Sequence, residues 1–263
     1  MKDYKSDKIN NDNKEARNDI VIGRNCVLEA IKSGRTIDSV LVANGGRNGS
    51  IVQITALCRK KDIIVKEVAS SKLDEMAAGA NHQGVIAVCA AKDFSDIEDI
   101  FALAEQRGEP PFIIIADELN DPHNLGAIIR TAEAAGAHGI IIPKRRSVGL
   151  TFTVARAAAG ALEYMPIVRV ANLASCIDNL KQRGVWVYAA DMDGQMWCQT
   201  DLKGACALVV GSEGFGVGRL IKDKCDVILS LPMNGQINSL NASVAAGILM
   251  YEFARQRHDI SAK

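Results

Sequence analysis

The chain has 263 residues, 48% of them hydrophobic and 24% charged, and its formal net charge is zero. This length and composition are typical of a protein with a real core, folded as one large domain or two modest ones. The neutral charge argues against a protein that holds nucleic acid by bulk electrostatics, and the apolar runs are too short to cross a bilayer as helices of about 20 residues.

The first 19 residues mix charges of both signs and contain no apolar segment. This pattern predicts a disordered tail over 1–19 and not a secretory signal peptide, so we expect a cytoplasmic protein with no membrane attachment. The cysteines form no CxxC pair and the four histidines have no ligand spacing, which predicts reduced thiols and no metal site. The seven cysteines are Cys26, Cys58, Cys89, Cys176, Cys198, Cys206 and Cys225.

Residues 20–92 are expected to form a small α/β domain. Apolar spacing predicts helices over 25–32, 51–60 and 70–77, and β-branched runs predict strands over 39–43, 63–68 and 85–90. We expect Ser70 or Ser71 to cap the third helix. Residues 93–111 are expected as a linker, in which Ser95 caps a short acidic helix that ends near Gln106.

Residues 112–263 are expected to form a second α/β domain. Strands are predicted over 112–116, 139–142, 166–170, 185–189, 207–210 and 227–231, and helices over 124–135, 151–160, 172–183, 216–223 and 239–257. Nearly continuous apolar strands that alternate with helices indicate a parallel sheet covered on both faces. Ligands of such sheets lie beyond the carboxyl ends of the strands, so the loops there are the candidate site.

The first of these loops runs from Asp117 to Arg130. Asn124 has two readings of about equal weight, a helix N-cap or a functional residue. Arg130 follows in a run of small apolar residues, on a helix that we expect to pack against the sheet. A guanidinium in such a place is normally paired or used for function.

The second loop, Val210–Gly216, reads VGSEGFG directly after an apolar strand. Its glycines would let backbone N–H groups approach a ligand, but neither the dinucleotide fingerprint nor the Walker pattern fits it. The Glu213 carboxylate suits a neutral or cationic ligand better than a pyrophosphate. The competing interpretation is a plain glycine-rich turn with Glu213 in solvent.

The third loop, Leu231–Ala245, opens a long helix through serines, asparagines and small residues. We expect Ser239 to be the N-cap of that helix. An N-cap at this position leaves Asn241 and Ser243 unexplained.

The three segments resemble, in the same order, the three motifs of the SpoU (TrmH-like) branch of the SPOUT methyltransferases. Asn124 and Arg130 match the first motif, Val210–Gly216 the second, and Leu231–Gly235 with Ser239–Ala246 the third. Residues 20–90 resemble the ribosomal-protein-like substrate-binding domain of many members. The nearest likeness, carried by Asp121–Asn124 and Pro143–Ser147, is to the subgroup that methylates a guanosine ribose of large-subunit (23S) rRNA.

The resemblance implies a SPOUT domain with a trefoil knot, although general topology rules disfavour knots. It also implies a homodimer with the catalytic pocket at the subunit interface, and S-adenosylmethionine as the cofactor. The cofactor-binding residues would be Gly211, Leu231, Met233, Ser239 and Leu240.

The resemblance further implies roles in the transfer of a methyl group to a ribose 2′-hydroxyl of RNA. Arg130 would contact the target ribose or its 3′-phosphate and stabilise the developing alkoxide, while Asn124, Glu213 and Asn241 orient Arg130 and the ribose. RNA contacts are expected from Lys144, Arg145 and Arg146, and from Arg24 in the first domain. Ala158 stands where a serine is common in the family, so no mechanism should depend on that hydroxyl.

Three alternatives stay open. The substrate could be a tRNA or another rRNA, because the motifs do not separate these. A catalytically silent RNA-binding protein would keep the fold, but the intact set of Asn124, Arg130, Glu213 and Asn241 argues against it. A nicotinamide-dependent oxidoreductase is supported only by the displaced glycine loop.

Overall fold

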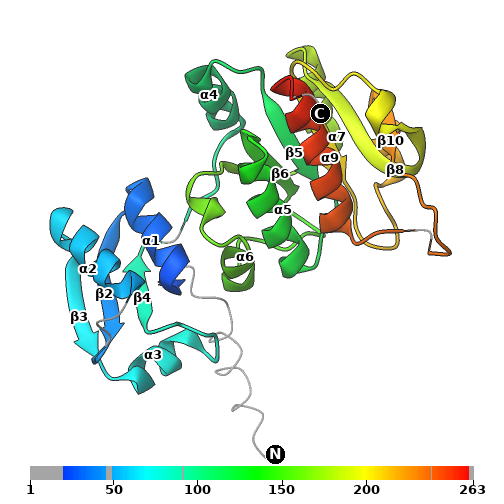
Figure 1. The fold of residues 1–263 in the computed structure, drawn as a ribbon. Helices are drawn as coiled ribbons and strands as arrows, with labels where there is room; N and C mark the ends of the chain where they lie inside the picture. Colours follow the sequence, from blue (N-terminus) through cyan, green and yellow to red (C-terminus); the bar gives the residue numbers. More distant parts are fainter. Residues whose placement is uncertain (1–19, 46–48, 91, 238, 261–263) are drawn as a thin grey trace, which may run out of the picture. The chain divides into compact units, whose positions relative to one another are not determined.

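The structure, a computed structural model, describes residues 20–45, 49–90, 92–237 and 239–260. The predicted tail over 1–19 lies outside the described residues. The chain divides into two compact units (Figure 1). The first extends to Lys92 and also includes Leu150–Arg156, and the second comprises Asp93–Gly149 and Ala157–Lys263.

The first unit contains a four-stranded sheet in the order β1–β4–β2–β3. Strand β4 is antiparallel to β1 and β2, whereas β2 and β3 are parallel and joined by a helix, as a parallel connection requires. The strands are β1 (Ile20–Ile22), β2 (Ile37–Ala43), β3 (Ile64–Val68) and β4 (Val85–Cys89), and the helices are α1 (Arg24–Ser33), α2 (Ser50–Lys60) and α3 (Ser70–Ala77).

Helices cover both faces of this sheet. Ile31 of α1 and Ile54 of α2 are buried with Val40 and other residues that point to one face, while Leu73 of α3 is buried against the opposite face. Alternate strand residues point to opposite faces, which produces two apolar layers from one sheet. Helix α3 begins after Ala69 without a side-chain cap, so the expected Ser70 or Ser71 cap is wrong.

The second unit contains a six-stranded sheet in the order β10–β8–β9–β5–β6–β7, in which every neighbouring pair is parallel. The predicted parallel sheet is confirmed, and the knot stays a prediction. The strands are β5 (Phe112–Ala116), β6 (Gly139–Pro143), β7 (Ile167–Val170), β8 (Trp186–Met196), β9 (Cys206–Val210) and β10 (Val227–Ser230). Strand β8 is longer than predicted because it resumes pairing with β10 after a register shift between Ile228 and Leu229.

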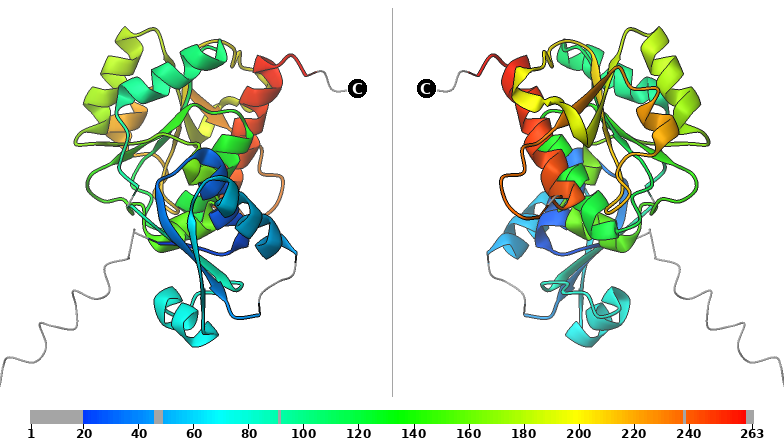
Figure 2. Two further views of the ribbon diagram at one scale, coloured as in Figure 1. Left: turned by 90° about the vertical axis from the view of Figure 1, so that its left-hand side faces the viewer. Right: turned by 90° about the vertical axis from the view of Figure 1, so that its right-hand side faces the viewer.

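The helices of the second unit lie on both faces of its sheet (Figure 2). Helices α4 (Ile97–Arg107), α7 (Leu173–Gln182) and α8 (Arg219–Lys222) share one buried apolar cluster with alternate strand residues. Helices α5 (Pro122–Ala134) and α9 (Ala242–Arg257) contact each other on the other face, where Phe253 stacks on Phe112 with ring centroids 5.1 Å apart. The predicted helix over 151–160 ends early, since Ala159 and Gly160 have positive φ. Its place is taken by α6 (Phe152–Ala157), nearly all of which belongs to the first unit, and by η1 (Ala161–Glu163).

Residues 93–111, which we expected as a linker, belong to the second unit. Helix α4 lies within this segment, and its Ile100 is fully buried in the apolar cluster of the sheet. Its N-cap is Asp96, whose N–H donates to the Asp99 carboxylate at 2.9 Å. The expected Ser95 cap is therefore wrong, and the Ser95 N–H instead donates to Ile167 O of β7 at 2.9 Å.

His138, just before β6, is a fully buried polar side chain of the second unit. Its Nδ1 accepts a hydrogen bond from the Phe112 N–H at 2.9 Å, so the ring proton of the neutral form is on Nε2, which lies 3.3 Å from Glu109 Oε2. Burial lowers the pKa of His138 to about 4. The buried His138 side chain is therefore neutral at physiological pH.

Candidate functional site

The three predicted loops meet beyond the carboxyl ends of β5, β9 and β10 in the second unit. Strands β5 and β9 are direct neighbours, and Asp117 N, just after β5, donates to Val210 O of β9 at 2.8 Å. The Asp117 carboxylate, which is 5% exposed, accepts a hydrogen bond from Gly218 N at 2.8 Å. Burial raises the pKa of Asp117. This acid ties the end of the glycine-rich loop to the first loop.

Asn124 is not the N-cap of α5. The cap is Asp121, whose carboxylate accepts from His123 N at 2.8 Å, with Pro122 in the first turn. Asn124 lies one turn further along, is 6% exposed, and directs its amide away from its own helix. The cap interpretation of Asn124 is therefore wrong.

The side chains of Asn124, Glu213 and Asn241 form one hydrogen-bonded cluster. Asn124 Nδ2 donates to Glu213 Oε1 at 3.1 Å, and Asn241 Nδ2 donates to Asn124 Oδ1 at 3.0 Å. Asn241 Nδ2 also donates to Glu213 Oε1. The structure thus brings together one residue from each of the three motifs.

Asn241 has a second role as the N-cap of α9. Its Oδ1 accepts from Ser243 N at 2.9 Å, from Val244 N at 3.3 Å and from Ser243 Oγ at 2.6 Å. The Asn241 amide thus uses its oxygen to cap the helix and its nitrogen to bond with Asn124 and Glu213. Ser239 is consequently not the cap, and α9 begins three residues later than predicted.

The glycine-rich loop folds into a closed turn. Ser212 N donates to Gly216 O at 3.1 Å, and Gly216 N donates to Ser212 O at 2.9 Å. A side chain at Gly211 would overlap the backbone of Gly216 and Val217, so only glycine allows this approach. Glu213 is exposed in this turn, as the competing interpretation expected, but its carboxylate also accepts hydrogen bonds from the two asparagines.

Arg130 lies on α5 but not in the packed environment that we expected. Its side chain is exposed, because Ile128, Ile129 and Ala132 occupy the buried face of the helix. Among the residues that the structure describes, none holds its guanidinium by a hydrogen bond or an ion pair. The expectation of a buried arginine is wrong, and the five N–H donors are available to a ligand.

The five expected cofactor-binding residues all lie at this edge of the sheet. Gly211 follows β9, Leu231 follows β10, and the other three precede α9. Met233 is 36% exposed and Leu240 is 41% exposed, so the segment between β10 and α9 carries apolar side chains that its own unit does not cover.

The expected RNA-binding cations differ in their surroundings. Lys144 and Arg145, after β6, are exposed and have no ion-pair partner among the described residues. Arg146 Nη1 lies 3.1 Å from Glu118 Oε1, so its charge is paired. Arg24, in the first unit, donates through Nε to Gln83 O at 2.8 Å.

The sequence did not predict roles for two residues near the candidate site, Asp117 and Arg169. The sequence assigned Asp117 no role within the first loop, although an acid directly after an all-apolar strand was a usable signal. Arg169 of β7 donates to Lys144 O at 3.0 Å and stacks over Phe94 at 5.2 Å, which adds a cation next to Lys144. Only the pairing of β6 with β7 brings it there.

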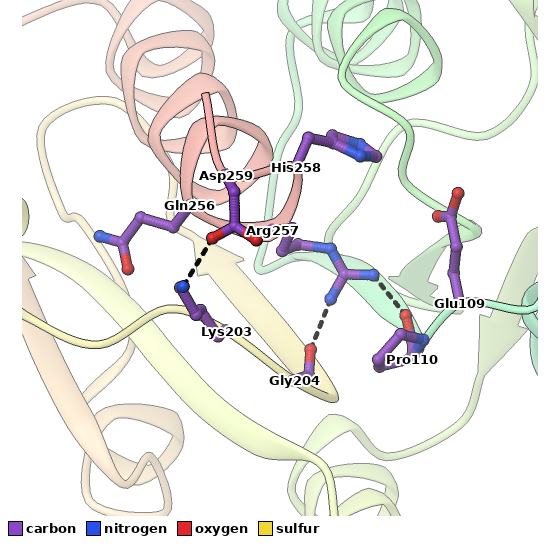
Figure 3. Close-up of a pocket in the computed structure, with 8 residues that line it drawn as sticks. All are labelled: Glu109, Pro110, Lys203, Gly204, Gln256, Arg257, His258 and Asp259. Carbon is purple, nitrogen blue, oxygen red and sulfur yellow. Dashed lines mark hydrogen bonds and ion pairs between the residues drawn. The ribbon is translucent and has the colours of Figure 1, made fainter. Parts of the chain in front are cut away.

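A surface pocket lies at the other end of α9 (Figure 3). Its polar groups satisfy one another: Lys203 pairs with Asp259 at 2.7 Å, and Arg257 donates to Gly204 O and Pro110 O. The 16 residues of α9 separate this pocket from Asn241 by about 24 Å. It is therefore not part of the candidate site.

In the described ranges, no group of three or more His, Cys, Asp or Glu residues could hold a metal ion. No described helix is both long and apolar enough to span a membrane. The seven cysteines all lie within the described ranges, and none of them forms a disulfide there.

Known families match both units. The SpoU rRNA methylase family matches residues 111–251, and the substrate-binding domain of RNA 2′-O ribose methyltransferases matches residues 20–95. YacO of Bacillus subtilis (strain 168), named as a TrmH family tRNA/rRNA methyltransferase, is 48% identical over 253 residues, which is 93% of this chain and 98% of YacO. A TrmH family relative from Staphylococcus haemolyticus is 45% identical over 92% of this chain and 97% of its own.

Solved structures of the same fold include two with bound S-adenosylmethionine (AdoMet). An AdoMet-bound rRNA methyltransferase from Sinorhizobium meliloti has 25% identity and a TM-score of 0.74, covering 95% of this chain and 90% of that one. The SpoU methyltransferase AviRb from Streptomyces viridochromogenes, in complex with AdoMet, has 24% identity and a TM-score of 0.75, covering 91% and 90%. The chain described here belongs to the SpoU family and is an RNA methyltransferase whose cofactor is S-adenosylmethionine.

Proposed function

We propose that this enzyme methylates a ribose 2′-hydroxyl, and that its substrate is a guanosine of 23S rRNA. The observation that supports ribose chemistry is the cluster of Asn124, Glu213 and Asn241, which lies at the start of the helix that carries the unpaired Arg130. A hydroxyl that loses its proton during reaction needs hydrogen-bond donors and a cation, and these residues supply both.

S-adenosylmethionine, when bound, supplies a methyl group on a positively charged sulfonium. The chain's own residues fit this cofactor: the exposed apolar side chains of Met233 and Leu240 suit its planar base, and the second and third loops contain no lysine or arginine that would repel the sulfonium. Gly211, Leu231 and Ser239 would bind it mainly through backbone groups. The Glu213 carboxylate is compatible with a cationic ligand nearby, whereas it would repel a pyrophosphate.

The residues of the cluster are proposed to orient the ribose. Glu213 Oε1 is occupied by both asparagine amides, whereas Oε2 has no hydrogen-bond partner among the described residues. This oxygen can accept a hydrogen bond from the ribose or from Arg130. Arg130 would contact the ribose or its 3′-phosphate, and its guanidinium N–H groups would stabilise the developing alkoxide. Holding the 2′-oxygen in line with the methyl group should lower the reaction barrier by roughly several kcal/mol more.

The exposed cations Lys144 and Arg145, with Arg169 beside them, are proposed to contact RNA phosphates, and Arg24 would contribute from the first unit. The relatives' names cover both tRNA and rRNA. The separate first unit and the sequence around His123 and Arg146 support 23S rRNA and a role in rRNA processing. The alternative is a tRNA substrate, and an enzyme acting on either RNA would work in the cytoplasm.

We further propose that the enzyme is a homodimer. Helix α9 exposes Val244 (50%), Ile248 (39%) and Tyr251 (55%), which recur every three to four residues and form one apolar stripe. A stripe of this kind beside Asn241 would bring a second copy next to the cluster, because apolar surface on a helix is normally covered by another element.

The deciding experiment is transfer of tritiated methyl groups from S-adenosylmethionine to unmodified transcripts of 23S rRNA and of tRNA. A 2′-O-methyl group blocks alkaline cleavage at that nucleotide, so the labelled site can be mapped. We expect a labelled guanosine ribose in 23S rRNA. Label in tRNA alone would support the alternative substrate, and label in a base would overturn the ribose proposal.

A further inference from the structure

Phe215 is an apolar side chain that its own unit leaves uncovered. It is 94% exposed, and no other large apolar side chain in the described part of the chain is exposed to this extent. Its position is next to the site, since it lies two residues after Glu213, a span of at most about 7 Å of chain. A full aromatic ring in water at the edge of a functional cluster suggests a binding role.

The backbone that carries Phe215 is held in place although the side chain is almost fully exposed. The paired N–H and C=O groups of Ser212 and Gly216 close the turn around it, and Gly214 and Gly216 have φ of +84° and +65°. Glu213 is fixed by the two asparagines, and Gly218 N is fixed by Asp117. The ring is therefore presented at a defined point before any ligand arrives.

An exposed cation close to Phe215 in the chain suits RNA as the ligand. Arg219 follows four residues later at the start of α8, and its side chain is 96% exposed with only a 3.9 Å contact to Asp223. An exposed aromatic ring followed by an exposed guanidinium can stack on a base and contact a phosphate. Any RNA that places a ribose at the cluster must pass within reach of this turn.

We propose that Phe215 is a stacking platform for an unpaired base of the RNA, next to the nucleotide that is methylated. The inference rests on the proposed ribose chemistry at the cluster of Asn124, Glu213 and Asn241. Phe215 takes no part in the transfer itself, so its removal weakens RNA binding and leaves binding of S-adenosylmethionine unchanged.

The first test compares Phe215→Ala, Phe215→Leu and Phe215→Trp in methyl transfer to the transcript that the wild-type enzyme labels. Loss of one stacked base should raise KM for RNA roughly tenfold in the Ala variant, with kcat changed less than twofold. Leu keeps the apolar bulk but cannot stack, so it should behave like Ala, whereas Trp should match or exceed wild type. Ile260→Ala, another exposed apolar position (57%), is the matched control and should leave KM unchanged.

A second test observes the contact directly. The indole emission that Phe215→Trp adds to the two native tryptophans should be quenched when the transcript is bound, and the dissociation constant for S-adenosylmethionine from calorimetry should equal that of wild type. An unchanged KM in the Ala variant, or emission that RNA does not quench, overturns the proposal.

Two further outcomes distinguish RNA stacking by Phe215 from a dimer contact and from the proposed ribose chemistry. If Phe215→Ala dissociates a dimer while Phe215→Leu preserves it, as light scattering would show, the ring contacts a second copy of the chain and not RNA, and the proposal is overturned. If wild-type enzyme labels a base, the proposed ribose chemistry fails. The RNA quenching of Phe215→Trp emission still tests the stacking contact in that case.

Discussion

Replacing Gly211 by alanine should open the loop that presents Glu213. The added Cβ would overlap the backbone carbonyl of Gly216 and the amide of Val217, far inside the 3.5–4.0 Å at which carbon atoms normally meet. No side chain can rotate away to relieve this overlap, because both partners are backbone. The turn must therefore move, and Glu213 moves with it.

The size of the effect follows from the hydrogen bonds that the closed turn contains. Two backbone bonds between Ser212 and Gly216 contribute about 1 kcal/mol each, and the bond from Gly218 N to the Asp117 carboxylate contributes about 2 kcal/mol because its acceptor is charged. An opened loop would lose about 4 kcal/mol in all. At roughly 2–4 °C per kcal/mol for a unit of this size, Tm should fall by about 10 °C.

The assay is thermal unfolding followed by circular dichroism, with calorimetric titration of S-adenosylmethionine at a temperature where every variant is folded. Gly235→Ala is the matched control in the third motif, since its Cβ would meet no atom within 4 Å, and it should change neither quantity. Gly214→Ala also meets open space but has φ +84°, so it should lose about 1–2 kcal/mol from backbone strain alone.

Binding of S-adenosylmethionine should be lost in Gly211→Ala and kept in both controls. A Gly211→Ala variant with wild-type Tm and wild-type affinity for the cofactor would refute the reasoning, because it would mean that the close backbone approach contributes nothing to the site.

Three other predictions concern Arg130, His138 and Ile248. Arg130→Ala should lower kcat by about 10²–10³-fold with cofactor affinity unchanged, as removal of an oxyanion donor does, and near-wild-type turnover would exclude this role. The folded pKa of His138, about 4, lies below its unfolded value of about 6.5, so its contribution to stability is complete above pH 6.5 and falls by up to about 3 kcal/mol toward pH 4. His138→Asn keeps an acceptor for Phe112 N but cannot titrate. The free energy of unfolding in urea should therefore fall less between pH 7.5 and pH 4.5 in that variant than in wild type. An equal fall in both proteins would contradict the assignment. Ile248→Asp should convert the proposed dimer to a monomer in light scattering, whereas Val52→Asp on α2, a more exposed helix position (52% against 39%), should not. A dimer that survives Ile248→Asp does not use this stripe.

Much of the fold follows from patterns that act over short distances. Apolar runs such as Phe112–Ala116 and Cys206–Val210 predict buried parallel strands, because only a sheet covered on both faces tolerates them. The three-residue β1 was missed, since such a short run has no period. Strand β8 was predicted too short because its second half is polar and exists only through its pairing with β10.

The site was predictable in composition but not in geometry. The motifs name Asn124, Glu213 and Asn241, but only the folded chain brings them within hydrogen-bond distance. Small apolar neighbours of Arg130 suggested burial, yet the helix turns that residue to the surface, because a run of small residues does not define which face is packed. The overlap at Gly211 could not be read from the sequence, since a glycine in a turn and a glycine against another backbone look alike.

The bond between Asn124 and Asn241 joins residues 117 positions apart. A ribosome that adds about 5–20 residues per second needs roughly 6–23 s to pass from one to the other. For most of that interval the growing chain already has the elements from β1 to α5, including Arg130, but it lacks the amide that completes the cluster and starts α9. A nascent chain of this enzyme can therefore meet RNA before it is able to methylate it.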